Sequence, residues 1–422
     1  MSLPASAPAP APATAFTPYQ KFVAGLLAFL QFAVILDFMI IAPLGAMIMP
    51  ALGITPKQFG MVVSAYAFSA ALSGLFAAGF ADRYDRKKLL LFFYFGFLGG
   101  TLWCGFATSY AMLLAARVTT GIFGGVIGSI LMAIATDLYA PALRGRVMGI
   151  VQTAFAASQV LGLPVGLYLS NHWTWHAPFF AMVALGAAGG LALALWLRPL
   201  AGHLDAPQER SAFAHLLHTV ADRHHIASFV ATALLTTGAF MLMPFSSEFT
   251  VNNLGIPLAD LPMVYLASGL CMIFFGPMVG KASDAFGKMP LFLFGCLIFT
   301  ASVAIYTRMG ASSLPLVILV NIVLFLGIVS RMIPFQAMVS SVPQPAQRGA
   351  FNAVKTSIQQ FAGGFAALLA GHIVEHQADG RLAHMDMVGN VVIASTVVSF
   401  VLATRIAREL AARGEGGERA KA

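Results

Sequence analysis

Four ionisable side chains lie deep inside long apolar stretches of the sequence, where a charge is costly and usually functional. A fifth, Glu248, lies near the outer end of such a stretch, where we expect it to be interfacial. Asp37 and Arg117 fall in stretches that run in opposite directions, and counting residues places both in the same half of a membrane. Arg331 and Lys355 lie in two later stretches, with no acidic residue at their depth. A buried acid can bind and release a proton, and a buried cation can bind an acidic group. The four residues therefore predict proton coupling and substrate binding.

We expect Asp37 to be the proton-binding residue and Arg117 to be its partner. A carboxylate in a site of low dielectric takes up a proton more readily, and a neighbouring guanidinium opposes that uptake. Such a pair can load and release a proton as its exposure to water changes. The alternative is a structural ion pair that only holds two helices together.

Uncharged polar side chains lie at helical spacing on two of these segments, on the one that carries Lys355 and on an earlier one. Asn352 and Gln359 lie three residues before and four residues after Lys355, and Gln152 and Gln159 share one face of an earlier segment. For Lys355, the alternative is an end residue whose amine reaches the membrane surface. The expected substrate cavity is lined by Gln152, Gln159, Arg331, Asn352, Lys355 and Gln359.

Residues 372–376 read His-Ile-Val-Glu-His, which fits the H-x-x-E-H pattern of a zinc metalloprotease. No soluble catalytic domain surrounds the motif and no clear third ligand accompanies it. We therefore expect neither an enzyme nor a bound metal or other cofactor, and an intramembrane metalloenzyme is the remote alternative. The cysteines Cys104, Cys271 and Cys296 lie far apart in apolar stretches and predict no disulfide framework.

The elements that position these residues must be membrane helices. Hydrophobic residues make up 59% of the 422 residues and charged residues 9%, whereas a soluble domain is typically ~45–50% apolar and ~25% charged. A helix that crosses the bilayer needs ~20 mostly apolar residues. The predicted fold class is an all-α membrane protein with twelve transmembrane helices, at about residues 22–45, 60–80, 90–108, 112–136, 147–169, 177–197, 226–250, 262–280, 290–307, 314–340, 350–374 and 387–407.

The longest polar stretch divides these helices into two groups of six. Lys and Arg are concentrated in the loops on one side of the membrane, which the positive-inside rule places in the cytoplasm together with both termini. The net charge of +8 then reflects orientation in the membrane and not a nucleic-acid partner. The expected domains are a disordered tail (1–20), a six-helix bundle (21–198), a cytoplasmic loop (199–224), a second six-helix bundle (225–408) and a cytoplasmic tail (409–422).

The two groups of helices also resemble each other in sequence. The segment AGFADRYDRK at 78–87 matches GKASDAFGKM at 280–289, so that Asp82 corresponds to Asp284. A second match aligns Arg144 with Arg348, and the two offsets are 202 and 204 residues. Nearly equal offsets indicate an internal duplication and two pseudo-symmetric bundles.

These features resemble the major facilitator superfamily over nearly the whole chain. The loop after the second helix matches the family pattern G-x-L-A-D-R-x-G-R-K at Asp82, Arg83, Arg86 and Lys87, although Ala78 and Asp85 replace its glycines. The second copy keeps both glycines. The segments at 36–50 and 117–125 resemble those of drug:proton antiporters, whereas 157–166 matches their fifth-helix pattern only in part.

The resemblance implies two bundles that rock about a central cavity, with a gate at the cytoplasmic side. Asp82 would accept hydrogen bonds from a helix N-terminus in the other half, and Arg83 or Arg86 would pair with Asp137, in contacts that form only when that side is closed. The alternative is a basic loop that only sets orientation. The expected gate residues are Asp82, Arg83, Arg86, Asp137, Gly280, Asp284 and Gly287.

The sequence thus predicts a monomeric secondary transporter of the inner membrane that exports small amphipathic organic compounds by alternating access. Its expected partners are the small-molecule substrate, protons and the lipid bilayer. A proton-coupled uptake symporter for an organic anion or a sugar is the alternative, favoured by Arg331 and Lys355.

Overall fold

The computed structural model describes residues 15–77, 80–205, 219–344 and 347–419, with side chains except at positions 82, 203, 205, 223, 224 and 413–419. Residues 1–14 of the expected N-terminal tail and residues 206–218 of the expected central loop lie outside this described part. The first helix begins at Pro18, a few residues before the expected boundary, because Thr17 caps it through a capping box. The last helix continues into the expected C-terminal tail as far as Arg419.

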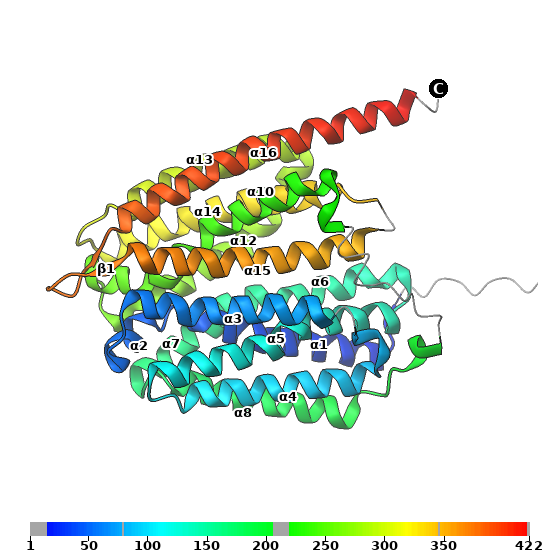
Figure 1. The fold of residues 1–422 in the computed structure, drawn as a ribbon, viewed down its shortest axis with the longest axis horizontal. Coiled ribbons are helices and arrows are strands. Elements are labelled where there is room, and N and C mark those ends of the chain that lie inside the picture. Colours follow the sequence, from blue (N-terminus) through cyan, green and yellow to red (C-terminus); the bar gives the residue numbers. More distant parts are fainter. Residues whose placement is uncertain (1–14, 78–79, 206–218, 345–346, 420–422) are drawn as a thin grey trace, which may run out of the picture.

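The first half of the chain forms six spans that lie side by side (Figure 1). Two of them are interrupted, the first between α1 and α2 and the fifth at η2. The elements are α1 (Pro18–Ile40), α2 (Gly45–Leu52), α3 (Pro56–Ala77), η1 (Ala81–Arg83), α4 (Arg86–Gly105), α5 (Tyr110–Leu138), α6 (Pro141–Ala157), η2 (Ser158–Gly162), α7 (Leu163–His172), α8 (Ala177–Trp196) and η3 (Gly202–Asp205).

The second half repeats this arrangement and adds a short antiparallel hairpin. The elements are α10 (Arg223–Phe240), η4 (Met243–Phe245), α11 (Ser246–Glu248), η5 (Phe249–Asn253), η6 (Leu258–Asp260), α12 (Leu261–Phe286), α13 (Lys288–Tyr306), α14 (Leu314–Val339), α15 (Arg348–Ile373), β1 (Glu375–His376), β2 (Leu382–Ala383) and α16 (Met385–Arg419).

Eleven helices in the described part of the chain are long and apolar enough to cross a membrane. The remaining expected span is α15, which has 26 residues but carries the polar residues Asn352, Lys355, Gln359 and Gln360. It lies beside α3 of the other half (Figure 1). The all-α membrane fold is therefore confirmed, and its most polar span lies where the two halves meet.

We call the end at which α1 begins and α16 ends the tail end, and the end that carries β1 and β2 the hairpin end (right and left in Figure 1). At the hairpin end, one hydrophobic core includes residues from both halves. Toward the tail end, each half has its own core, one from residues 23–197 and one from residues 229–406.

Hydrogen bonds between the halves lie on the hairpin side of the molecule. Ser64 Oγ donates to the carbonyl of Gly364 (2.7 Å), and Ser247 Oγ donates to that of Ala42 (3.1 Å). Asn171 Nδ2 donates to the Leu258 carbonyl (2.9 Å). The two halves are therefore joined at the hairpin end, while the cores of their tail-end parts are separate.

Candidate functional site

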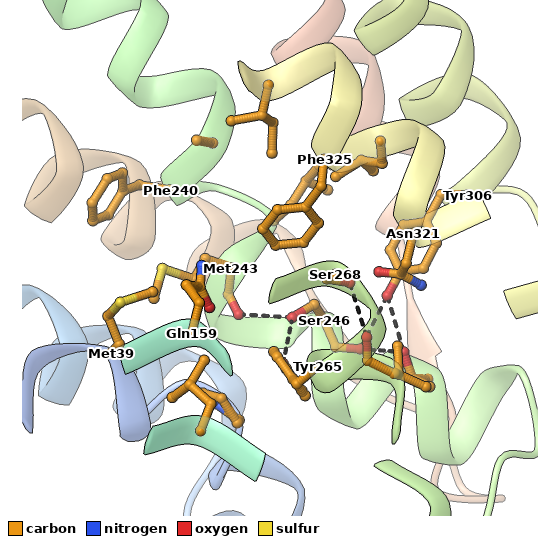
Figure 2. A pocket seen from close by; sticks show the side chains of 18 of the residues that line it. Met39, Gln159, Phe240, Met243, Ser246, Tyr265, Ser268, Tyr306, Asn321 and Phe325 are labelled. Carbon is orange, nitrogen blue, oxygen red and sulfur yellow. Dashed lines mark hydrogen bonds between the residues drawn. The ribbon is translucent and has the colours of Figure 1, made fainter. Parts of the chain in front are cut away.

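A cavity of about 260 Å³ lies between the two halves. Its walls come from the first and fifth spans of the first half and from the seventh to tenth spans of the second half (Figure 2). Most lining side chains are apolar and several are aromatic, which is typical of sites for organic ligands. The lining includes Phe38, Met39, Phe155, Leu163, Phe240, Met243, Phe299, Leu324, Phe325 and Met332.

The polar lining side chains are concentrated on the second half. Tyr306 and Thr250 share a hydrogen bond of 3.1 Å between their hydroxyls, and the Tyr306 hydroxyl also donates to the Ser246 carbonyl (3.0 Å). The hydroxyls of Ser246 and Tyr265 are 3.3 Å apart, and Asn321 also lines the cavity. All of these groups are uncharged at neutral pH. The cavity thus has one hydrogen-bonding wall on the second half, and its other walls are apolar apart from Gln159.

Gln159 is the expected cavity residue that lines this space. It lies in η2, a single π-helical turn, and such turns often mark functional sites. In the same turn, a Cβ at Gly162 would come within 2.5 Å of the Leu36 side chain, so glycine permits the fifth span to pack closely on the first. Gln159 therefore faces the hydrogen-bonding wall from the opposite half.

The other five expected cavity residues do not line it. Gln152 and Asn352 are exposed, and Gln359 is half-buried. Lys355 Nζ donates to Gln336 Oε1 (2.8 Å), which gives this cation an uncharged partner.

Arg331 is fully buried one layer behind the cavity wall. Its guanidinium stacks 3.5 Å from the ring centre of Phe299, which does line the cavity, and its Nη1 lies 3.4 Å from the Thr396 hydroxyl. The structure therefore pairs Arg331 with an aromatic ring and a hydroxyl, and does not direct its charge into the cavity.

Asp37 and Arg117 form the expected buried pair. Arg117 Nη1 donates to Asp37 Oδ2 at 2.8 Å, and both side chains are fully buried. Thr101 Oγ1 donates to the other carboxylate oxygen (3.0 Å), and the guanidinium lies 4.5 Å from the ring centre of Tyr66. Because Phe38 next to Asp37 lines the cavity, the pair lies directly behind its wall.

Three side chains of the expected gate are placed as follows. Arg86 Nε lies 3.2 Å from Asp137 Oδ2, and its Nη1 donates to the Ala81 carbonyl (3.1 Å), whereas Arg83 is exposed. The pairing with Asp137 is therefore present. Both residues of the pair belong to the first bundle, on α4 and at the end of α5. The expectation that the pair forms only when the cytoplasmic side is closed stays a prediction.

The remaining gate residues lie near the end of α12 or outside the described side chains. Gly287 has a φ of 93° between α12 and α13, a conformation that L side chains rarely adopt, so the tight turn needs glycine. Asp284 is exposed, and a Cβ at Gly280 would meet open space. The Asp82 side chain and residues 345–346 before α15 lie outside the described part of the chain, so the contact expected between Asp82 and the neighbouring helix stays a prediction.

The H-x-x-E-H segment does not form the helical pair that zinc binding by this motif needs. The helix ends at Ile373, before Glu375 and His376, which form strand β1. Among the described residues, no group of three or more His, Cys, Asp or Glu side chains is arranged to hold a metal ion.

Two bundles of six spans, joined at one end around a central cavity, define the architecture of a membrane transporter. The family model of the Major Facilitator Superfamily matches residues 27–367 and 228–420. The chain belongs to this superfamily and is a multi-pass membrane transporter, not an enzyme.

Relatives in sequence include an MFS-type transporter and two multidrug resistance proteins. The chain is 26% identical to the uncharacterized MFS-type transporter YceJ of Bacillus subtilis over 276 residues, which is 64% of this chain and 69% of the relative. It is 34% identical over 131 residues to Multidrug resistance protein 3 of the same organism, covering 31% of this chain and 25% of the relative. A match to Multidrug resistance protein fnx1 of Schizosaccharomyces pombe is 28% identical and covers 39% and 28%. The last two matches thus span less than a third of these relatives.

Solved structures show the same fold at low identity. A bacterial homologue of the human lysosomal transporter Spinster, in an inward-facing and occupied conformation, gives a TM-score of 0.71 at 16% identity over 93% of this chain and 98% of that one. A peptide transporter in complex with sulfate gives 0.73 at 14% identity over 94% and 97%.

Proposed function

We propose that this transporter exports small, uncharged amphipathic organic molecules in exchange for protons. The observation that carries the proposal is the cavity lining, in which the described residues are apolar or neutral and the hydrogen-bonding groups gather on one wall. A charged substrate would lose its hydration there without meeting an opposite charge, which is costly. The names of the two multidrug resistance relatives support efflux.

We assign the protein to the inner membrane of the cell. The tail end then lies in the cytoplasm, because the loops rich in Lys and Arg are at that end. The joined hairpin end then faces outward. In this assignment the structure corresponds to an inward-facing state, and export requires the halves to separate at the hairpin end.

Asp37 is the proposed proton carrier for this exchange. Protonation of its carboxylate removes the charge that Arg117 pairs with at 2.8 Å, and leaves the guanidinium buried without a counter-ion. The two protonation states therefore favour different positions of α1 relative to α5. Because Phe38 and Met39 line the cavity, such a shift also changes the binding surface.

The alternative of organic-anion uptake has less support in the geometry. Arg331 is covered by Phe299, and Lys355 has Gln336 as a partner, so neither cation is among the residues that line the cavity.

A thermal-stability screen tests the substrate class. The protein in nanodiscs is heated with matched pairs of aromatic compounds, each pair an amide and the corresponding carboxylate. A ligand that binds the folded state raises the unfolding midpoint by mass action, so we expect the amides to raise it and the carboxylates not to. Greater stabilisation by the carboxylates would contradict the proposal and favour the organic-anion alternative.

A further inference from the structure

A second buried carboxylate lies at the hairpin end, away from Asp37. Glu248 ends α11 and is 2% exposed. Its Oε1 lies 2.6 Å from Nε2 of His376 in β1, and its Oε2 is buried without a hydrogen-bond partner among the described residues. The adjacent Ser246 and Thr250 line the cavity, which places this acid behind the wall that carries the hydrogen-bonding groups.

The imidazole reaches from this buried acid to the surface. The His376 side chain is 34% exposed. The hairpin that carries it is fixed to η5 by two hydrogen bonds of 2.9 Å, from Asn253 Nδ2 to the Leu382 carbonyl and from the Leu382 amide to Asn253 Oδ1. His376 is thus held where it can take a proton from water at the hairpin end and share it with Glu248.

The first half of the chain covers this site. α11 packs against α2, β1 packs against α3, and Ser247 beside Glu248 donates to the Ala42 carbonyl. Glu248 and His376 both belong to the second half. When the two halves separate at the hairpin end, the pair remains together and its surroundings become hydrated.

Charge determines how costly it is to close this end over the pair. When the imidazole is neutral, the covered Glu248–His376 pair carries one net negative charge, and an uncompensated buried charge is strongly destabilising. One added proton makes the pair neutral overall, so closing the hairpin end over it costs less. His376 is the ionisable side chain that contacts Glu248 among the described residues. The other ionisable groups on α3, α15 and the hairpin at this end are exposed, and they are Lys57, His372, Glu375, Asp379, Arg381 and His384.

We infer that Glu248 and His376 form a second proton-binding site, separate from Asp37 and Arg117, and that one proton bound there favours closure of the hairpin end. The proton comes from bulk water at that end and returns to it on opening. The site deepens the proposed function: if the hairpin end faces outward, external protons close the outer side after the substrate leaves.

A distance measurement between the two halves tests this inference without any substrate. Spin labels are attached at Thr108→Cys and Ala311→Cys, two exposed positions at the hairpin end in opposite halves, after the three native cysteines are replaced. The protein in nanodiscs is measured at about pH 5.5 and about pH 8.5, which bracket the titration of an ordinary imidazole. We expect the short-distance, closed population to dominate at the lower pH and to decrease at the higher pH, by up to about tenfold per pH unit in the ratio of closed to open.

The two site variants have different expected results. Glu248→Gln removes the charge and should keep the hairpin end closed at both pH values. His376→Gln leaves the carboxylate alone, so closure should be confined to lower pH than in the wild type. Glu375→Gln and His372→Gln, which change exposed neighbours, are the matched controls and should retain the wild-type response.

Three results would overturn the inference: a closed population that does not depend on pH, an unchanged response in Glu248→Gln, or loss of the response in Asp37→Asn. The last would assign the effect to the first pair. The measurement reports a distance and not transport. The inference about closure of the hairpin end can therefore be confirmed even if transport assays show no proton-coupled export.

Discussion

Arg117 Nη1 lies 2.8 Å from Asp37 Oδ2 in a fully buried site that joins the first and fourth spans. Thr101 and Tyr66 complete the surroundings of this pair from the third and second spans. Four helices of one half thus meet at a single ion pair directly behind the cavity wall. A change in the protonation of Asp37 therefore alters interactions that involve all four helices.

Replacing Asp37 with Asn should abolish proton-driven transport and leave exchange of substrate for substrate intact. The amide keeps the shape of the side chain but cannot carry the proton. Both activities are measured in proteoliposomes with a ligand from the stability screen. Asp379→Asn, at an exposed position of the hairpin, is the control and should behave as wild type. Full proton-driven transport by Asp37→Asn would remove this residue from the mechanism.

Replacing Arg117 with Met should destabilise the protein, as Asp37→Asn should. Removing one member of a buried ion pair leaves an uncompensated charge and typically costs about 3–5 kcal/mol. The unfolding midpoint in detergent reports the effect, and the double variant with Asp37→Asn should recover part of the loss. If the double variant is as unstable as the sum of the single variants, the two residues are not energetically coupled.

These residues also show how far the sequence alone can be interpreted. Helix positions follow from the length and composition of apolar stretches, and opposite charges at equal depth identify Asp37 and Arg117. Thr101 and Tyr66 could not be identified, because neutral polar residues are common in membrane helices. Glu248 and His376 are 128 residues apart, and only the packing of the hairpin on the seventh span brings them together. Arg331 looked like a cavity cation because sequence gives the depth of a residue and not the direction of its side chain.

Replacing Gly60 with Ala should shift the protein toward a state that is open at the hairpin end. A Cβ at this position of α3 would lie 2.7 Å from the Ala367 carbonyl oxygen and 3.2 Å from the Cα of Gly371, both in the other half. Backbone atoms cannot move aside easily, so the contact between α3 and α15 should weaken. The spin-label pair at positions 108 and 311 measures the shift.

Gly25→Ala is the matched control for this change. A Cβ at Gly25 in α1 would meet no atom within 4 Å, so the distance distribution should stay as in the wild type. An unchanged distribution in Gly60→Ala would show that the closed end does not depend on this close approach.

Replacing Tyr306 with Phe should weaken binding of ligands that carry a hydrogen-bonding group and spare purely apolar ones. The change removes the hydroxyl that bonds Thr250 and the Ser246 carbonyl. A typical net hydrogen bond is worth about 1 kcal/mol, so we expect roughly a fivefold loss of affinity. Ligand titration by tryptophan fluorescence or calorimetry measures it. An equal loss for both kinds of ligand would mean that the hydroxyl only supports the fold.

The sign of proton movement tests the central claim most directly. Proteoliposomes loaded with a ligand from the screen and a pH-sensitive dye are diluted into ligand-free buffer, so that the ligand flows out down its gradient. Exchange for protons predicts that the lumen becomes more acidic, whichever way the protein is inserted, and that Asp37→Asn removes this change. A lumen that becomes more alkaline as the ligand leaves, or ligand efflux with no change in pH, would contradict the account.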